Sequence, residues 1–224
     1  MPFRLRDDLS FCRVEDHLIF LDIGNDQYFR LSSPMERAFL AYHSGERSTD
    51  ISSLIAHNLL TDAPPSQDWP PAPIIPAPIR SALESNPLPR TARLTTLLET
   101  FSVVFSTQWQ LKARGLVSTL TSATRLRKRN MSADAATGED HSEKLLLEAS
   151  ADFVRARPYI PIETCCLLDS ISMLKILARK RLHANLVFGV TSAPFSAHCW
   201  LQEGDLVLND TVGNAKANTP IRVL

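Results

Sequence analysis

The sequence predicts an α+β protein made of two modules that a proline-rich linker separates. Residues 1–62 show alternating strand patterns followed by short helical patterns. Residues 63–89 are rich in proline, and residues 90–224 show several helices followed by strands. The proline-rich segment therefore marks the boundary between two domains.

Residues 10–31 predict two strands joined by a tight turn. Apolar residues alternate on both sides of Gly24-Asn25-Asp26, which has strong turn chemistry. Val14, Leu18 and Phe20 precede this turn, and Tyr28, Phe29 and Leu31 follow it. The segment is therefore predicted to be a β-hairpin.

Short helices are predicted after the hairpin. Ser32 or Ser33 caps the first, which has Pro34 in its first turn and ends at Gly45. A second helix is predicted from about residue 49 to residue 60. Strands followed by short helices make a small winged-helix-like module. The apolar stripe of the first helix consists of Met35, Ala38, Phe39 and Tyr42.

The linker is predicted from the density of proline. Nine of the fifteen prolines fall in residues 63–89. Such density disfavours helix and favours an extended, semi-rigid chain. These prolines are Pro64, Pro65, Pro70, Pro71, Pro73, Pro76, Pro78, Pro87 and Pro89.

Helical patterns return from residue 91. A basic run at 125–129 is typical of a solvated helix end. Residues 130–140 have the composition of a loop, and a further helix is predicted over about 142–157. In the first of these helices one apolar face is formed by Leu94, Leu97, Leu98, Phe101, Val104, Phe105 and Trp109.

A buried helix is predicted to follow Thr164, which can serve as its N-cap. Pro158 and Pro161 disfavour an earlier start. Cys165 or Cys166 then lies at the helix N-terminus, where the helix dipole and free amides lower the pKa of a thiol. A thiolate nucleophile is predicted at this position, and Asp169 is expected to be an exposed carboxylate of the first turn.

A histidine and an aspartate follow on predicted strands. In FSAHCWLQ, His198 and Trp200 share one face of a strand, while Cys199 faces the other way and is expected to pack as a small apolar residue. Asp210 ends the next strand, after a turn at Gly204-Asp205. A nucleophile, a base and an orienting carboxylate are the parts of a thiol enzyme.

These motifs resemble a known family. The words CLLDS, AHCW and LND are similar to the C-L-x-x-S, A-H-x-W and N-D words of the B protein of lasso-peptide biosynthesis, a transglutaminase-like leader peptidase. Cys166, His198 and Asp210 occupy the matching positions. The chain departs from the family at the helix exit, where a glycine is usual, and at Cys199, where alanine is commoner.

The resemblance implies a papain- or transglutaminase-like cysteine-protease domain over residues 90–224. It implies that Cys166 attacks the scissile carbonyl, that His198 transfers protons and that Asp210 orients the imidazole. The substrate would be a ribosomal precursor peptide, and the freed core would pass to an asparagine-synthetase-like cyclase that closes a macrolactam ring. A transamidase and a leader-binding adaptor without catalysis are the alternatives.

The fragment DIGNDQYFRLS has a resemblance of its own. It is similar to the leader-recognition domain related to PqqD, the small chaperone of pyrroloquinoline quinone biosynthesis. In that family a leader peptide adds as a strand to an exposed sheet edge. The resemblance implies leader binding by residues 1–62 through Tyr28, Phe29 and Leu31. DNA binding is disfavoured because the second helix, DISSLIAHNLL, has no Lys or Arg.

Composition excludes several other classes. The formal net charge is zero, which disfavours nucleic-acid binding. The four cysteines have no CxxC spacing, so neither a metal nor a cofactor is expected. The N-terminus lacks a signal-peptide pattern and no apolar run reaches 18 residues, which predicts a cytoplasmic protein without a membrane partner.

Overall fold

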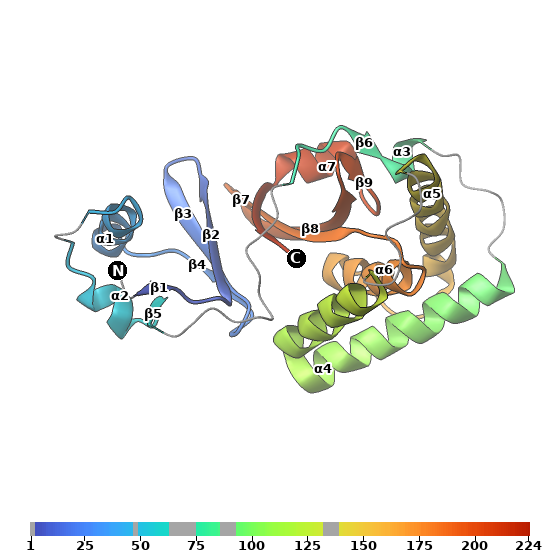
Figure 1. Cartoon of the computed structure of the whole chain (residues 1–224), viewed down its shortest axis with the longest axis horizontal. Helices are drawn as coiled ribbons and strands as arrows, with labels where there is room; N and C mark the ends of the chain where they lie inside the picture. The colour runs from blue at the N-terminus through green and yellow to red at the C-terminus, as the bar shows by residue number, and fades with distance from the viewer. Residues whose placement is uncertain (1–2, 47–48, 63–74, 86–92, 132–138) are drawn as a thin grey trace. The chain divides into compact units, whose positions relative to one another are not determined.

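The structure of the chain is a computed structural model that describes residues 3–46, 49–62, 75–85, 93–131 and 139–224 (Figure 1). Its internal contacts divide the chain into two units, Met1–Ala72 and Pro73–Leu224. Both contain helices and strands, so the predicted mixture of the two is confirmed. Among the described residues, no helix combines the length and apolar character that crossing a membrane requires.

The first unit contains an antiparallel sheet in the order β2-β3-β4 and a small pair, β1 with β5. The predicted hairpin is confirmed as β3 and β4, around a turn in which Asp22 accepts the N–H of Asn25. Residues 10–22, however, form two strands instead of one. A turn at Glu15, whose φ is 54°, separates them. The strands are β1 Arg4–Leu5, β2 Leu9–Val14, β3 His17–Asp22, β4 Gln27–Phe29 and β5 Leu60–Thr61.

The described residues of this unit also form two helices, α1 Ser33–His43 and α2 Ser52–Ala56. The N-cap of α1 is Ser32, and Gly45 follows the helix with a φ of 90°, as the turn chemistry predicts. The second helix was predicted over about 49–60 but extends only over Ser52–Ala56, so the prediction is too long at both ends. Asn58 takes a φ of 56° and ends it, and the chain then enters β5. The core of the unit contains Leu9, Leu18, Phe20, Phe39, Leu54, Leu59 and Leu60.

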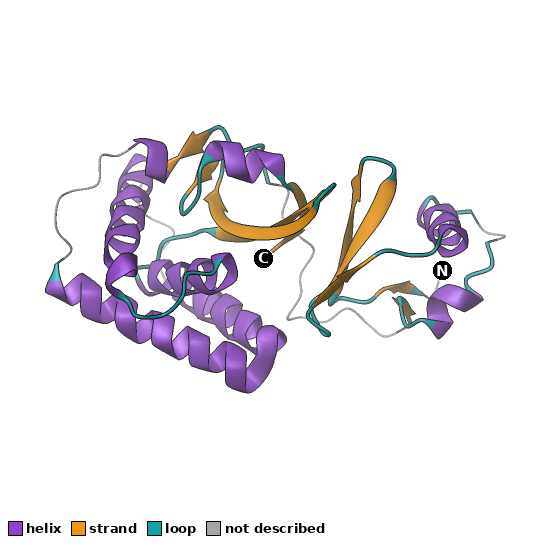
Figure 2. Ribbon diagram, turned by 180° about the vertical axis from the view of Figure 1, so that it is seen from behind, coloured by secondary structure: helices purple, strands orange, loops and turns teal. Residues whose placement is uncertain are grey.

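The second unit is a five-stranded sheet with helices packed on it (Figure 2). In the described part of the unit the strand order is β10-β7-β8-β9-β6; β9 pairs with β6 in parallel, and the other three pairs are antiparallel. Helix α6 packs against β8, and α4 packs against α6. The strands are β6 Arg80–Ser81, β7 Asn185–Ser192, β8 Phe195–Glu203, β9 Leu206–Val207 and β10 Thr219–Val223. The helices are α3 Ala82–Ser85, α4 Leu94–Met131, α5 Glu139–Ala156, α6 Cys166–Arg179 and α7 Val212–Ala217, with a 3-10 turn at Arg157–Tyr159.

Part of the predicted linker belongs to this second unit. Residues 63–74 and 86–89 of the linker lie outside the described residues, but 75–85 pack on the sheet. Arg80 bonds to Asp205 at 2.7 Å, and Gln202 donates to the carbonyl of Pro76 at 2.8 Å. Residues 79–86 are the longest proline-free run in the segment, which explains why a strand and a helical turn form there.

Helix α4 bends sharply at Gly115, which has φ 73° and ψ 178°. Before the bend, the residues buried against the rest of the unit are Thr100, Val103, Val104 and Thr107. Most of the predicted apolar face therefore points into solvent, because Val104 is its only fully buried member. An apolar face is ordinarily the buried one, so this helix has two faces with different partners.

Candidate active site

Cys166 is the first residue of α6, and the chain that leads to it is held by a buried arginine. The Arg157 guanidinium donates to the carbonyls of Ile162 and Glu163 at 2.9 and 3.0 Å. Its Nε also donates to Asp169 at 2.6 Å. Asp169 is therefore an ion-pair partner and not the exposed carboxylate that the sequence predicted. One side chain thus fixes the approach to the helix and its first turn together.

Cys165, and not Thr164, is the N-cap of α6. Its extended backbone directs the chain into the helix, and its carbonyl accepts the N–H of Asp169 at 2.9 Å. The Cys165 side chain is exposed, whereas Cys166 is half-buried. The two adjacent thiols therefore have different surroundings.

His198 lies in β8, opposite Gly189 of β7. Trp200 is buried on the same face and its indole ring stacks near the imidazole, with 6.1 Å between ring centroids. A Cβ at Gly189 would come within 2.7 Å of the Trp200 ring. The glycine in the NLVFGV strand thus makes room for the tryptophan that covers one side of the imidazole.

Asp210 lies beyond β9, which is shorter than the predicted strand. Its Oδ1 accepts the backbone N–H of Thr211 at 2.7 Å, and its carbonyl accepts the Ser81 hydroxyl at 2.6 Å. Asn214, in α7, donates to Oδ2 of Asp210 at 2.8 Å and lies 3.2 Å from Nε2 of His198. Thr211 and Asn214 therefore hold the carboxylate, and Ser81 holds the backbone of the same residue.

The three predicted side chains lie in one hydrogen-bonded series. Nε2 of His198 bonds to Oδ2 of Asp210, and the imidazole also bonds to the Cys166 thiol. Because Nε2 faces the carboxylate, Nδ1 is the ring nitrogen that remains for the sulfur. Among the described residues, no group of three or more His, Cys, Asp or Glu side chains is placed to hold a metal ion.

The electrostatics of this series favour a thiolate and an imidazolium. Hydrogen bonds from the Cys199 thiol, from His198 and from the Cys199 N–H lower the pKa of Cys166 to about 4, against the opposing effect of burial. Hydrogen bonds to Asp210 and to Cys166 raise the pKa of His198 to about 9. Burial alone would raise the pKa of Asp210, but its bonds to His198, Thr211 and Asn214 outweigh burial and lower it. Such a pair is a ready nucleophile and proton donor.

Cys199 has a larger part in the site than the sequence predicted. It is buried, as expected, but its thiol and its backbone N–H both bond to the Cys166 sulfur. The pKa of Cys199 is raised, first by its bond to Cys166 and then by burial, so it stays a protonated donor. The alternation of a strand shows which face a side chain takes but not which neighbouring element it meets, and this contact was missed for that reason.

Two residues of the sequence motifs join the elements of the site. Ser170 donates to the carbonyl of Cys199 at 3.3 Å and accepts from Asn209 at 2.8 Å. Asn209 in turn accepts the N–H of Leu201 at 2.7 Å. The serine of CLLDS and the asparagine of LND therefore lock α6 to β8. Asn214 was also missed, and its position four residues after Asp210, at a helix start, is the only signal for it.

In the first unit, the predicted leader-binding residues do not share one surface. Phe29 and Leu31 line a hollow of about 350 Å³, together with Met35, Arg6 and His57. Phe29 also stacks on the core residue Phe20, with 5.3 Å between ring centroids. Tyr28 does not line this hollow, because neighbouring residues of a strand point to opposite faces. The strand that carries Tyr28 and Phe29, β4, is an outer strand of its sheet.

A comparison with protein families gives one match. The model of a family described as the transglutaminase-like superfamily matches residues 101–223, a range that contains Cys166, His198 and Asp210. No curated protein and no solved structure matches the chain.

Proposed function

Because the chain belongs to the transglutaminase-like superfamily, we propose that it is a cysteine peptidase that removes the leader from a ribosomally made lasso-peptide precursor. Members of this superfamily are typically Cys-His-Asp enzymes. The observation that carries the proposal is the pairing of a low-pKa Cys166 with His198, which Asp210 holds through Nε2. The lasso precursor as substrate rests on the resemblance of the CLLDS, AHCW and LND words.

In the proposed reaction the Cys166 thiolate attacks the scissile carbonyl carbon. A carbon–sulfur bond forms, the carbon–nitrogen bond breaks, and His198 gives its proton to the leaving amine. A water molecule then loses a proton to His198 and attacks the thioester, which releases the leader acid and restores the thiolate. The free N–H groups at the start of α6, including that of Cys166, are suited to bind the oxyanion.

The first unit is proposed to bind the leader. An extended peptide can add as a further strand beside an outer strand of a sheet, and β4 is an outer strand of its sheet. The hollow beside Phe29 and Leu31 offers an apolar site for leader side chains. The freed core amine would then serve an asparagine-synthetase-like cyclase, the partner that the family resemblance implies.

The test is incubation of the full chain with a lasso-type precursor peptide, followed by mass spectrometry. Hydrolysis yields two fragments whose masses sum to that of the precursor plus one water. A precursor joined to an added amine would instead identify a transamidase, and an intact but bound precursor an adaptor. Cys166→Ala should abolish the fragments. Fragments of equal yield from this variant would overturn the proposal.

A further inference from the structure

A row of large apolar side chains lies exposed along the first segment of α4. These five residues, called the α4 stripe, are 43–70% exposed. The rings of two of them, Phe101 and Phe105, stack on each other with 6.0 Å between centroids. At 1.5 Å per residue the stripe is roughly 22 Å long. Its members are Leu94, Leu98, Phe101, Phe105 and Trp109.

The α4 stripe is distinct from the face by which this helix joins the domain. Val103, Val104 and Thr107 are fully buried, and Lys175 of α6 donates to Thr107 at 3.1 Å. At 100° per residue, the buried face and the stripe lie on roughly opposite sides of the helix. The helix is therefore already anchored, and the stripe is a second apolar surface. Contiguous exposed apolar surface of this kind marks an interaction site.

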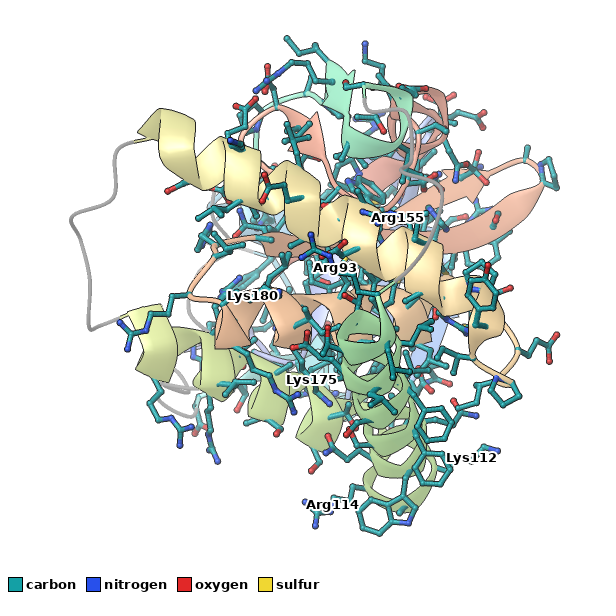
Figure 3. The ribbon with its side chains drawn as sticks, turned by 90° about the vertical axis from the view of Figure 1, so that its right-hand side faces the viewer. Arg93, Lys112, Arg114, Arg155, Lys175 and Lys180 are labelled. Atoms are coloured by element: carbon teal, nitrogen blue, oxygen red, sulfur yellow. The ribbon has the colours of Figure 1, made fainter. Side chains whose placement is uncertain are left out.

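Both ends of the stripe are basic. Figure 3 shows Arg93 at one end of this helical segment and Lys112 and Arg114 at the other. The Arg114 guanidinium lies over the Trp109 ring, 5.4 Å from its centroid. The same arginine lines a hollow of about 500 Å³ on the second segment of α4, and no carboxylate is among the described residues that line it. These are Arg114, Ser118, Thr121, Ser122, Arg125, Leu126 and Arg129.

We propose that the α4 stripe docks an amphipathic helix of a partner protein that carries carboxylates beside its apolar seam. Successive members of the stripe are four, three, four and four residues apart. The first three of these separations alternate between four and three, as in the apolar seam between two packed helices. Its five residues cover only about 80° of the helix circumference, the narrow width of such a seam. Aromatic side chains beside an arginine are also the residues that contribute most to protein–protein affinity. Carboxylates on the partner would face Arg93, Lys112 and Arg114.

Two other occupants fit less well. A second copy of the chain, paired antiparallel, would bring Lys112 and Arg114 to the N-terminal end of the other stripe, where the helix dipole and Arg93 are positive. A membrane surface is met by helices with a broad apolar face, and an 80° stripe is narrow for that purpose. Charge and width therefore both favour an acidic helix.

The probes are two fluorescent synthetic helical peptides with the same leucine seam. One has glutamates beside the seam and the other has lysines, and binding to the full chain is followed by fluorescence anisotropy. We expect saturable binding of the glutamate peptide and at least about tenfold weaker binding of the lysine peptide. Phe105→Ser and Arg114→Glu should each weaken binding of the glutamate peptide about tenfold or more.

Ile79→Ser is the matched control, because Ile79 is 62% exposed in the same unit but lies outside the stripe. It should leave peptide binding unchanged. Since Phe105 is exposed, its substitution should preserve the fold, which circular dichroism verifies. Equal affinity for the two peptides would overturn the proposal. So would Phe105-dependent binding to vesicles of phosphatidylglycerol, or dimers that Phe105→Ser dissolves.

Discussion

Cys165 and Cys166 are adjacent, yet only one of them lies in the hydrogen-bonded series. Cys165 is the exposed N-cap of α6, whereas Cys166 bonds to His198 and to Cys199. We expect Cys166→Ala to abolish peptide cleavage and Cys165→Ala to keep turnover within about threefold of the wild type. Single-turnover assays of the two variants test this. An inactive Cys165 variant beside an active Cys166 variant would reverse the assignment of the nucleophile.

The pH dependence of the reaction follows from the same contacts. Cys166 must be a thiolate, so activity should be lost as the pH falls through about 4, the pKa of its thiol. His198 must be protonated to serve the leaving amine, so activity should also be lost as the pH rises through about 9. Alkylation of Cys166 by iodoacetamide between pH 3 and 10, followed by peptide mapping, reports the thiolate directly. A single rise in alkylation near pH 8.5, the ordinary value for cysteine, would contradict the ion pair.

The carboxylate and its amide neighbour allow a graded prediction. Asp210→Asn should lower kcat by roughly 10²- to 10⁴-fold, because the imidazole would lose the acceptor that fixes its tautomer. Asn214→Ala should have a smaller effect, about tenfold, because Thr211 and His198 still hold Asp210. Thermal unfolding should remain near that of the wild type in both variants. Equal losses would make Asn214 as important as the carboxylate itself.

At the level of single residues, the three side chains of the series could be predicted from the sequence, but the residues that hold them in place could not. Cys166, His198 and Asp210 lie in recognisable sequence motifs, and the structure brings them together. Their catalytic role stays a prediction. Asn214 and Cys199 contact the series through distances between elements, which strand alternation and helix period do not contain. The arginine behind Asp169 was missed for the same reason.

Among the elements, α4 offers the clearest test of local geometry. Gly115 combines φ 73° with ψ 178°, a region that only glycine occupies readily. Nothing lies within 4 Å of a Cβ built there, so an added methyl group meets strain and not a clash. We expect Gly115→Ala to lower the free energy of unfolding by about 1–3 kcal/mol.

Urea denaturation is the measurement, and Gly213→Ala is the control. Gly213 lies in α7 with equally open surroundings and without a positive φ. Alanine there should be neutral or slightly stabilising, because alanine favours helix. A loss of stability of equal size in both variants would remove the bend at Gly115 as the cause.

Helices and strands were predicted best where strong turn or capping residues mark their ends. The hairpin turn at Gly24, the N-terminus of α1 and the helix after Cys165 all depend on local chemistry, and the structure contains each of them. The face of α4 that is buried could not be predicted this way. Its buried set includes Thr100 and Thr107, while its exposed set holds most of the large apolar residues. Hydrophobicity alone identifies an interface but not its partner.

For the molecule as a whole, the division into two units predicts a division of labour. Because residues 75–85 pack on the second unit, the pieces to separate are 1–72 and 73–224, not 1–62 and 90–224. We expect residues 1–72 to bind a labelled leader peptide and residues 73–224 to show little binding by fluorescence anisotropy. Cleavage by 73–224 alone should be much slower, because tethering raises the local concentration of a scissile bond, typically to the millimolar range.

Leu31→Ala in the full chain serves as the milder variant, since Leu31 lines the hollow of the first unit without belonging to its fully buried core. It should raise KM and leave kcat unchanged. Tight leader binding by residues 73–224 would transfer recognition to the second unit.

The bond between Cys166 and His198 joins two side chains of the chain itself, one from α6 and one from β8. The low pKa of the Cys166 thiol therefore comes from groups that the fold positions, and not from a group of the peptide to be cut. A thiolate does not by itself distinguish one peptide bond from another. The choice of substrate must therefore be made by the residues that bind the peptide near Cys166, and not by the sulfur. Substrate selectivity in such a protein comes from how the peptide is bound and positioned. A small electrophile that needs no such binding should therefore label Cys166 at the same rate with or without leader peptide present.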